Sequence, residues 1–367
     1  MNRHFRLSSA LVALAVLTAC SPSVYTGGGT ATPTPAPTPA PTRPPSWPVV
    51  TRSHIDLWLH GYAMLLRDTA TVPVFRRGYR ERVRALKAQR NVSTLLDVNR
   101  ERLQARLALS PNLVNGQFLP MYFASWDQMQ QVINLFLQAS GNPQAATDRT
   151  LAQFFAVLAQ SYPAAAEREW LRIFAESIED ERRKFFQEFW TSEHATRRAQ
   201  VRAVDSLWQG GLRLRLQRFL NNTQQDAGDF VLAITLGGEG RTVNFASRQN
   251  AIATTMPDSE PNDAFYVFVH EAVSSLVVSA VNDNTTPSEQ RAGLAAQFVT
   301  AGAVRGGAML LQRVAPELVA GYIRYYLMQA AQLTTGDATA QFATVFALPD
   351  LVRRAIDRQL EVVLGGL

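Results

Sequence analysis

The sequence predicts an α+β fold that is predominantly α, in which a small β-sheet precedes a buried central helix. Apolar residues recur at helical spacing through most of residues 53–220, whereas residues 230–256 contain short runs rich in β-branched residues. Residues 263–281 are almost continuously apolar, which predicts a helix inside the core. With 367 residues, 47% of them hydrophobic, the chain is long enough to form a large core.

The first 19 residues have the composition of a secretion signal. Arg3 and Arg6 make the start positive, and residues 7–19 are apolar but shorter than the roughly 20 residues that a membrane-spanning helix needs. This stretch ends in Leu17-Thr18-Ala19-Cys20. Cys20 is the only cysteine, so no disulfide can form within the chain.

The segment Leu17-Thr18-Ala19-Cys20 resembles the lipobox of bacterial lipoproteins. The resemblance implies that residues 1–19 are removed and that Cys20 is acylated, which anchors the protein in a lipid membrane outside the cytoplasm. Ser21 follows the cysteine at the position where an aspartate would keep a lipoprotein out of the outer membrane. The resemblance therefore implies release to the outer membrane if the host has two membranes. The expected localisation is therefore the cell envelope.

Residues 20–49 are expected to form the lipidated cysteine and a linker. Glycine occupies positions 27–29, and proline alternates with small residues over positions 32–45. The alternation favours an extended polyproline II chain, which would hold the domain away from the lipid. Residues 50–367 are expected to form one predominantly helical domain.

The first part of this domain is expected to consist of amphipathic helices. They are predicted over residues 54–67, 74–90, 95–109, 125–139, 148–162, 165–190 and 196–220. Ser125 is a suitable N-cap for one of them, and residues 111–120 are expected to form a loop. The many aromatic residues between positions 154 and 190 are interpreted as a core stripe rather than a cofactor site.

The hydrophobic period then changes. Strands are predicted over residues 230–236, 241–246 and 251–256, and further helices over 263–281, 286–310, 316–332 and 351–364. The glycine-rich residues 237–240 lack the Lys-Ser/Thr of a phosphate loop and are interpreted as a hairpin turn. Thr286, Pro287 and Glu289 match a capping box with proline in the first turn.

The charge pattern does not favour nucleic acid as a partner. The formal net charge of +6 includes Arg3 and Arg6, so the mature chain is only mildly basic. Arginines are interleaved with acids, as in residues 179–183, which predicts a solvated helix face. No basic stripe with stacking aromatics occurs in the sequence.

The predicted helix 263–281 carries His270 and Glu271 in its middle. Two ionisable side chains inside an apolar helix need polar partners, because burying them alone costs several kcal/mol. In a purely structural role, His270 would bond to a buried carbonyl and Glu271 to an arginine. The other mature histidines, His54, His60 and His194, are expected to be surface or hydrogen-bonded core residues.

The segment His270-Glu271-Ala272-Val273-Ser274 resembles the HExxH motif of the zincin metallopeptidases, which stands on a buried helix after a small sheet. The resemblance implies a zinc ligand at His270 and a catalytic base at Glu271. Ser274 replaces the second histidine, and residues 300–303 resemble the segment that carries a third ligand, without its acid. The domain is therefore interpreted as a degenerate zincin in which both residues are vestigial and no cofactor is expected.

Three functions remain open from the sequence. The first is an envelope lipoprotein with an inactive metallopeptidase-like domain that binds or scaffolds an envelope protein or peptide. The second is a divergent zinc-dependent peptide hydrolase that acts through Glu271. The third is a helical structural lipoprotein unrelated to peptidases, in which the likeness around His270 is accidental.

Overall fold

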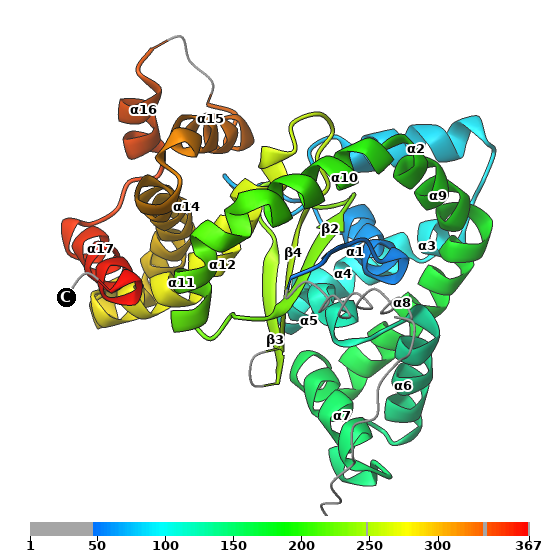
Figure 1. Ribbon diagram of the computed structural model, residues 1–367. Helices are drawn as coiled ribbons and strands as arrows, with labels where there is room; N and C mark the ends of the chain where they lie inside the picture. The colour runs from blue at the N-terminus through cyan, green and yellow to red at the C-terminus, as the bar shows by residue number, and fades with distance from the viewer. Residues whose placement is uncertain (1–46, 247–248, 333–335, 366–367) are drawn as a thin grey trace, which may run out of the picture. The chain divides into compact units, whose positions relative to one another are not determined.

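The computed structural model describes residues 47–246, 249–332 and 336–365. The predicted signal, the predicted lipidation site Cys20 and the predicted linker as far as residue 46 lie outside this range. Within it, helices dominate and a small sheet of four strands is present, which confirms the predicted α+β, predominantly α class. Figure 1 shows the sheet with helices from both halves of the chain around it.

The helices that precede the main sheet strands lie where helices were predicted, but the one predicted over residues 74–90 begins only at Tyr79, and the one predicted over residues 165–190 continues to Thr196. They are α1 (Ser53–Leu65), α2 (Tyr79–Gln89), α3 (Leu95–Val98), α4 (Arg100–Leu109), α5 (Asn112–Asn115), α6 (Trp126–Gln138), α7 (Arg149–Ser161), α8 (Ala165–Glu181), α9 (Gln187–Thr196), α10 (Arg198–Leu207) and α11 (Arg213–Asn222). The hydroxyl of Ser125 accepts a hydrogen bond from the amide of Gln128 at 3.2 Å, so the predicted N-cap is confirmed.

Four predictions for this part of the chain need correction. The predicted helix 95–109 is two helices, because Asn99 ends α3 and precedes α4. The predicted loop 111–120 contains α5 and the 3-10 helix Gly116–Tyr122. The long helices 165–190 and 196–220 each contain a π-helical turn, at Arg182–Phe186 and Trp208–Leu212, and such turns often mark functional or crowded positions.

The sheet consists of β1 (Val49–Val50), β2 (Gly228–Ala233), β3 (Arg241–Ala246) and β4 (Gln249–Thr255) in the order β1-β2-β4-β3. β1 and β4 both run parallel to β2, and β3 pairs antiparallel with β4. Residues 237–240 therefore do not form the predicted hairpin turn. They connect β2 to a strand that is not its neighbour, which places β3 at an edge of the sheet.

The strand β1 was not predicted, and it begins within residues assigned to the linker. Two residues before this strand, Trp47 is already buried, and its indole donates a hydrogen bond to the carbonyl of Gln225 at 3.0 Å. The carbonyl of Trp47 in turn accepts from the indole of Trp208 at 2.9 Å. The start of the described part of the chain is thus held against residues far along the sequence, an arrangement that local composition cannot reveal.

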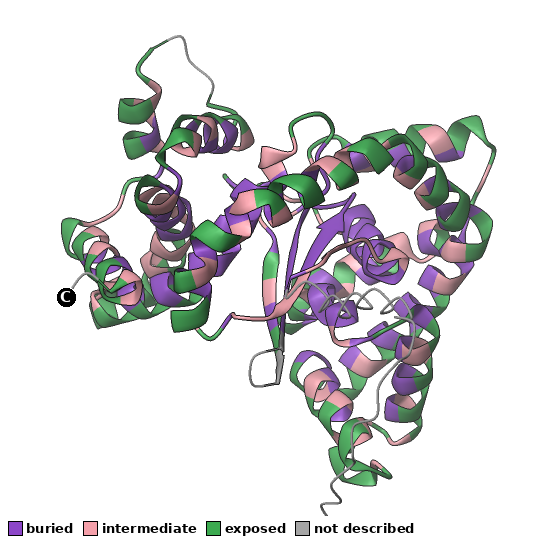
Figure 2. Cartoon of the chain, viewed as in Figure 1, coloured by how far each residue is buried: buried purple, intermediate pink, exposed green. Residues whose placement is uncertain are grey.

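The central helix α12 (Asn262–Asp283) packs against β4, α14 (Leu294–Val314) and α17 (Asp350–Leu364). Its length and hydropathy are those of a membrane-spanning helix, yet 78% of its most apolar window is buried inside the protein. It is therefore a core helix, and Figure 2 shows burial concentrated on α12, α1 and the central strands.

The other late helices are α13 (Pro287–Arg291), α15 (Val319–Gln329) and α16 (Ala338–Val345), of which α16 was not predicted. The predicted capping box at Thr286 is confirmed, because its hydroxyl accepts from the amide of Glu289 at 3.2 Å and its own amide donates to the Glu289 carboxylate at 2.7 Å. The predicted helix 286–310 is interrupted at Gly293. This residue has a φ of +74°, a conformation that favours glycine, and it separates α13 from α14.

Part of the predicted solvated face at residues 179–183 is in fact buried. The Glu181 side chain is 0% exposed and pairs with His60 at 3.0 Å and with the ammonium of Lys87 at 2.8 Å. Asp180 is also buried and accepts from the amide of Leu95 at 2.8 Å. The helix α3 covers this side of α8, so a charged pattern typical of solvent contact lies inside the protein.

Candidate functional site

His270 and Glu271 lie in the middle of α12 and are buried, with 4% and 6% of their surfaces exposed. The partners expected for a structural pair are not the ones found. The Nδ1 atom of His270 lies 2.8 Å from Oε1 of Glu271, and since a carboxylate only accepts, Nδ1 carries the proton. The two side chains therefore bond to each other, and in its neutral form the ring presents the lone pair of Nε2 on the other side.

The carboxylate of Glu271 is also held by the sheet. Its Oε1 accepts from the amide of Gly240 at 3.0 Å, and its backbone carbonyl accepts from the hydroxyl of Thr242 at 3.2 Å. A Cβ at Gly240 would lie 2.0 Å from the carbonyl oxygen of Ala253 and 3.1 Å from Cγ of Glu271, so only glycine permits this close approach. β3 and α12 are thereby joined at the site.

Burial alone would raise the pKa of Glu271. The hydrogen bond from His270, the charges of His270 and Arg241, and the amide of Gly240 outweigh that effect and lower the pKa below its ordinary value. The carboxylate is thus ionised and already engaged by two donors. A carboxylate in this state is a poor candidate for a free general base.

The Nε2 atom of His270 is buried and has no hydrogen-bond partner among the described residues. Its ring lies against Tyr326, with centroids 5.5 Å apart and an interplanar angle of 24°. The hydroxyl of Tyr326 donates to the carbonyl of Gly238 at 3.1 Å, and that of Tyr325 to the carbonyl of Gly237 at 3.2 Å. The glycine-rich connection is thereby attached to α15 beside His270.

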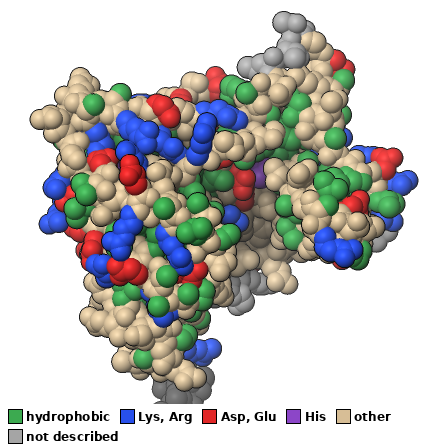
Figure 3. All heavy atoms as spheres, turned by 180° about the vertical axis from the view of Figure 1, so that it is seen from behind, with side chains coloured by type: hydrophobic (Ala, Val, Ile, Leu, Met, Phe, Trp, Pro, Cys, Tyr) green, Lys and Arg blue, Asp and Glu red, His purple; other side chains and the backbone are tan. Residues whose placement is uncertain are grey.

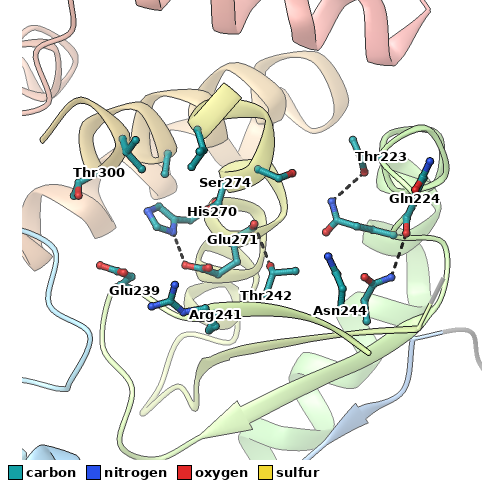
Figure 4. A pocket seen from close by; sticks show the side chains of 16 residues that line it. Thr223, Gln224, Glu239, Arg241, Thr242, Asn244, His270, Glu271, Ser274 and Thr300 are labelled. Carbon is teal, nitrogen blue, oxygen red and sulfur yellow. Dashed lines mark hydrogen bonds and ion pairs between the residues drawn. The ribbon is translucent and has the colours of Figure 1, made fainter. Parts of the chain in front are cut away.

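His270 and Glu271 line a cavity of about 430 Å³ between β3, α12 and α14. Its walls are mostly amides, hydroxyls and charged groups: Thr223, Gln224, Gln225, Glu239, Arg241, Thr242, Asn244, Asn250, His270, Glu271, Ser274, Ser275, Val278, Val299, Thr300 and Ala303. Figure 4 shows Glu239, Arg241, His270 and Glu271 together at one end, with Thr223, Gln224 and Asn244 at the other. In Figure 3, a hollow on the rear face contains a histidine beside acidic side chains.

Glu239, Arg241 and Gln225 line the cavity but were not predicted as site residues from the sequence. Gln225 is buried, and its Oε1 has no partner among the described residues, although its amide nitrogen donates to the carbonyl of Ala272 at 3.0 Å. Glu239 follows two glycines in the connection that was interpreted as a hairpin turn. An acid inside a glycine-rich connection was the available signal, but its position beside His270 depends on the strand order.

Burial raises the pKa of the Glu239 carboxyl, and the negative charge of Glu271 raises it further. His270 and Arg241 act in the opposite direction without cancelling the rise. Among the described residues, the Glu239 carboxylate has no hydrogen bond and no ion pair, and the guanidinium of Arg241 lies over the ring of Phe118 at 5.0 Å. The end of the cavity beside His270 therefore contains one carboxylate, that of Glu239, without a close counter-ion.

The residues present do not fit the zinc site of a zincin. Ser274, at the position of the second ligand, turns its hydroxyl to the carbonyl of His270 at 2.9 Å. Thr300 and Ala303 line the cavity where the resemblance places a third ligand, and neither carries an acid. Within the described ranges, no group of three or more histidine, cysteine, aspartate or glutamate side chains is placed to hold a metal.

The other histidines lie in separate, satisfied positions. His54 contacts the carbonyl of Phe123 at 2.9 Å, and His60 lies between Tyr79 and Glu181 at 2.9 and 3.0 Å. His194 contacts the hydroxyl of Thr51 at 2.8 Å. None of the three lines the cavity beside His270, so the structure does not bring the histidines together.

Comparisons of the chain with protein families, with curated proteins and with solved structures find no match.

Proposed function

We propose that this chain is an envelope lipoprotein, anchored through acylated Cys20, whose helical domain binds an extended peptide segment in the cavity between β3 and α14. In this proposal the zincin-like pair His270 and Glu271 recognises ligand and does not hold zinc. The observation that supports it most is the cavity itself, which combines a buried unpartnered histidine nitrogen with one wall formed by an edge strand. The domain would then capture an envelope protein or peptide without cleaving it.

The position of β3 is suited to a peptide ligand. β3 pairs with β4 on one side only, and no backbone hydrogen bond joins its other side to a described residue. Unpaired strand edges bind extended peptides through their free amides and carbonyls, and neighbouring pockets select side chains. β3 also contributes Arg241, Thr242 and Asn244 to the cavity, so a bound peptide would meet both backbone and side chains.

A large side chain on the α14 wall of the cavity is expected to remove peptide binding. The variant Thr300→Trp places a large ring on the α14 wall, and we expect the affinity of the full chain, purified in detergent, to fall roughly tenfold or more for a fluorescent pool of random peptides. Fluorescence anisotropy measures this. Thr344→Trp is the matched control, because both threonines bond to the carbonyl four residues earlier in an α-helix, but Thr344 lies on α16 outside the cavity.

The same preparation separates the alternatives. One tightly bound zinc per chain, together with chelator-sensitive peptide cleavage that Glu271→Gln abolishes, would replace the binding proposal with the zinc-dependent hydrolase. Absence of binding to any peptide in the pool would favour the structural lipoprotein. The engaged state of Glu271 and the serine at position 274 favour binding over hydrolysis.

Replacement of Cys20 by alanine is expected to release the protein from the membrane. The thiol is the proposed site of acylation, and several acyl chains anchor a protein where a single chain is marginal. Fractionation of cells that express each form should move the chain from the membrane fraction to the soluble fraction, or leave an unprocessed precursor. Ser21→Ala is the control and should stay with the membrane. Full membrane retention of a processed Cys20→Ala protein would exclude this anchor.

A further inference from the structure

The end of the cavity around His270 presents hydrogen-bond acceptors that the protein does not use. The buried Nε2 of His270 has no partner, and its other nitrogen is committed to Glu271. The Glu239 carboxylate lines the same end and forms no hydrogen bond with a described residue. A buried polar atom without a partner costs free energy, so a site that keeps Nε2 of His270 in this state beside an unpaired, half-buried carboxylate is suited to a ligand that donates to both.

The charges at the His270 end of the cavity indicate the sign of the charge that the ligand carries. Glu239 and Glu271 are acidic, Arg241 is basic, and the histidine ring is neutral when Nε2 carries its lone pair. The four side chains then sum to one negative charge. Figure 4 shows the carboxylates of Glu239 and Glu271 on either side of the Arg241 guanidinium, so an anionic ligand would meet a negative charge on both sides.

The cavity also has a wall at this end. The glycine-rich connection that carries Glu239 is attached to α15 through the hydroxyls of Tyr325 and Tyr326, and Tyr326 lies against the His270 ring. A peptide that enters from the Thr223 end would therefore stop at the His270 end of the cavity. Only its terminus or one of its side chains would reach this position. Either a peptide amino terminus or a lysine side chain would bring three N–H donors and one positive charge.

We propose that Glu239, His270 and Glu271 form a recognition site for a primary ammonium group carried by the bound peptide. The group donates to Nε2 of His270 and to the Glu239 carboxylate, and its charge balances the site. This inference rests on the proposed function, because the peptide brings the ammonium group into the cavity. A metal ion is the less suitable cation, since the described residues place no set of three ligands around a common point.

Four short peptides with a fluorescent label at the carboxyl end test the proposal on the full chain in detergent. They share one alanine-rich sequence and differ in having a free amino terminus, an acetylated terminus, an acetylated terminus with one lysine, or an acetylated terminus with one acetyl-lysine. We expect at least one free-amine peptide to bind roughly 10- to 100-fold more tightly than the fully acetylated peptide, the range typical of charged hydrogen bonds. The comparison of terminus and lysine identifies the source of the amine.

Two variants with opposite expected effects distinguish recognition from simple structural damage. Glu239→Gln removes the negative charge with little change in shape, and the preference for the free amine should fall to within about threefold. Arg241→Gln removes the competing positive charge, so the preference should increase. Loss of structure would weaken binding in both variants. Glu101→Gln, which removes an exposed carboxylate on α4 outside the cavity, should leave the preference unchanged.

Equal binding of all four peptides would overturn the ammonium site while leaving the peptide-binding proposal intact. Absence of binding to all four and to the random pool would overturn both. Tighter binding of the fully acetylated peptide, or an unchanged preference in Glu239→Gln, would also contradict the assignment. Support requires the amine preference, its loss in Glu239→Gln and its increase in Arg241→Gln.

Discussion

Replacement of Glu181 by alanine is expected to lower the free energy of unfolding by about 3 to 5 kcal/mol. The carboxylate of Glu181 is buried between His60 and Lys87, and it also accepts from the hydroxyl of Thr94. Without it, the buried ammonium of Lys87 keeps the hydroxyl of Thr94, at 3.0 Å, and a single carboxylate, that of Asp97 at 2.5 Å, whose side chain is partly exposed. Breaking one side of a buried ion pair costs more than the pair contributes, because the remaining charge loses its compensation.

Urea unfolding of the full chain in detergent measures the loss, and Glu188→Ala is the matched control. Glu188 lies seven residues further along the same helical segment and pairs with Arg90 at 3.3 Å, but its side chain is 81% exposed. An exposed pair contributes about 0 to 1 kcal/mol, so this variant should unfold almost like the original protein. A loss in Glu181→Ala as small as in Glu188→Ala would contradict the buried network.

The difference in the free energy of unfolding between Glu181→Ala and Glu188→Ala should depend on pH. Burial alone would raise the pKa of Glu181, but the hydrogen bonds and charges of His60 and Lys87 lower it from 4.5 to about 2. The folded state therefore binds this proton less readily than the unfolded state. The stability that Glu181 contributes is fully present above about pH 4.5 and is lost as the pH falls toward about 2. The difference between the two proteins should shrink across that interval.

Replacement of Trp208 by alanine is also expected to lower the free energy of unfolding, by about 3 to 5 kcal/mol. The indole is 1% exposed, and its ring centroid lies 4.6 Å from that of Phe268 on α12 and 5.3 Å from that of Phe230 on β2. Its nitrogen also donates to the carbonyl of Trp47. One side chain thus joins the π-helical turn, the sheet, the central helix and the start of the described chain.

Trp208→Phe separates packing from hydrogen bonding. The smaller ring keeps much of the contact with Phe268, and the carbonyl of Trp47 still accepts from the side-chain amide of Gln209 at 3.0 Å. We therefore expect this variant to lose only about 1 to 2 kcal/mol. Limited proteolysis gives an independent check, because Trp208→Ala should expose the segment around Trp47 before the rest of the chain unfolds. Equal losses in both variants would show that ring volume is not the dominant contribution.

The order of elements was largely predictable because it depends on local pattern. The first and last residues of β3 are those of the predicted strand. The helix caps at Ser125 and Thr286 were predictable because their side chains are of types that accept hydrogen bonds from helix amides. The burial of α12 followed from its composition. The prediction was wrong where long-range packing overrides pattern: Glu181, in a charged run typical of a helix surface, is covered by α3.

The candidate site also has features that follow from local sequence pattern and features that depend on long-range packing. Composition and helical spacing predicted that His270 and Glu271 would be buried on a core helix with no second histidine one turn later. The place of β4 between β2 and β3 became known only from the folded structure, and this strand order brings Gly240 onto Glu271 and Glu239 beside His270. Strand order arises from packing between residues distant in sequence, which no local pattern records.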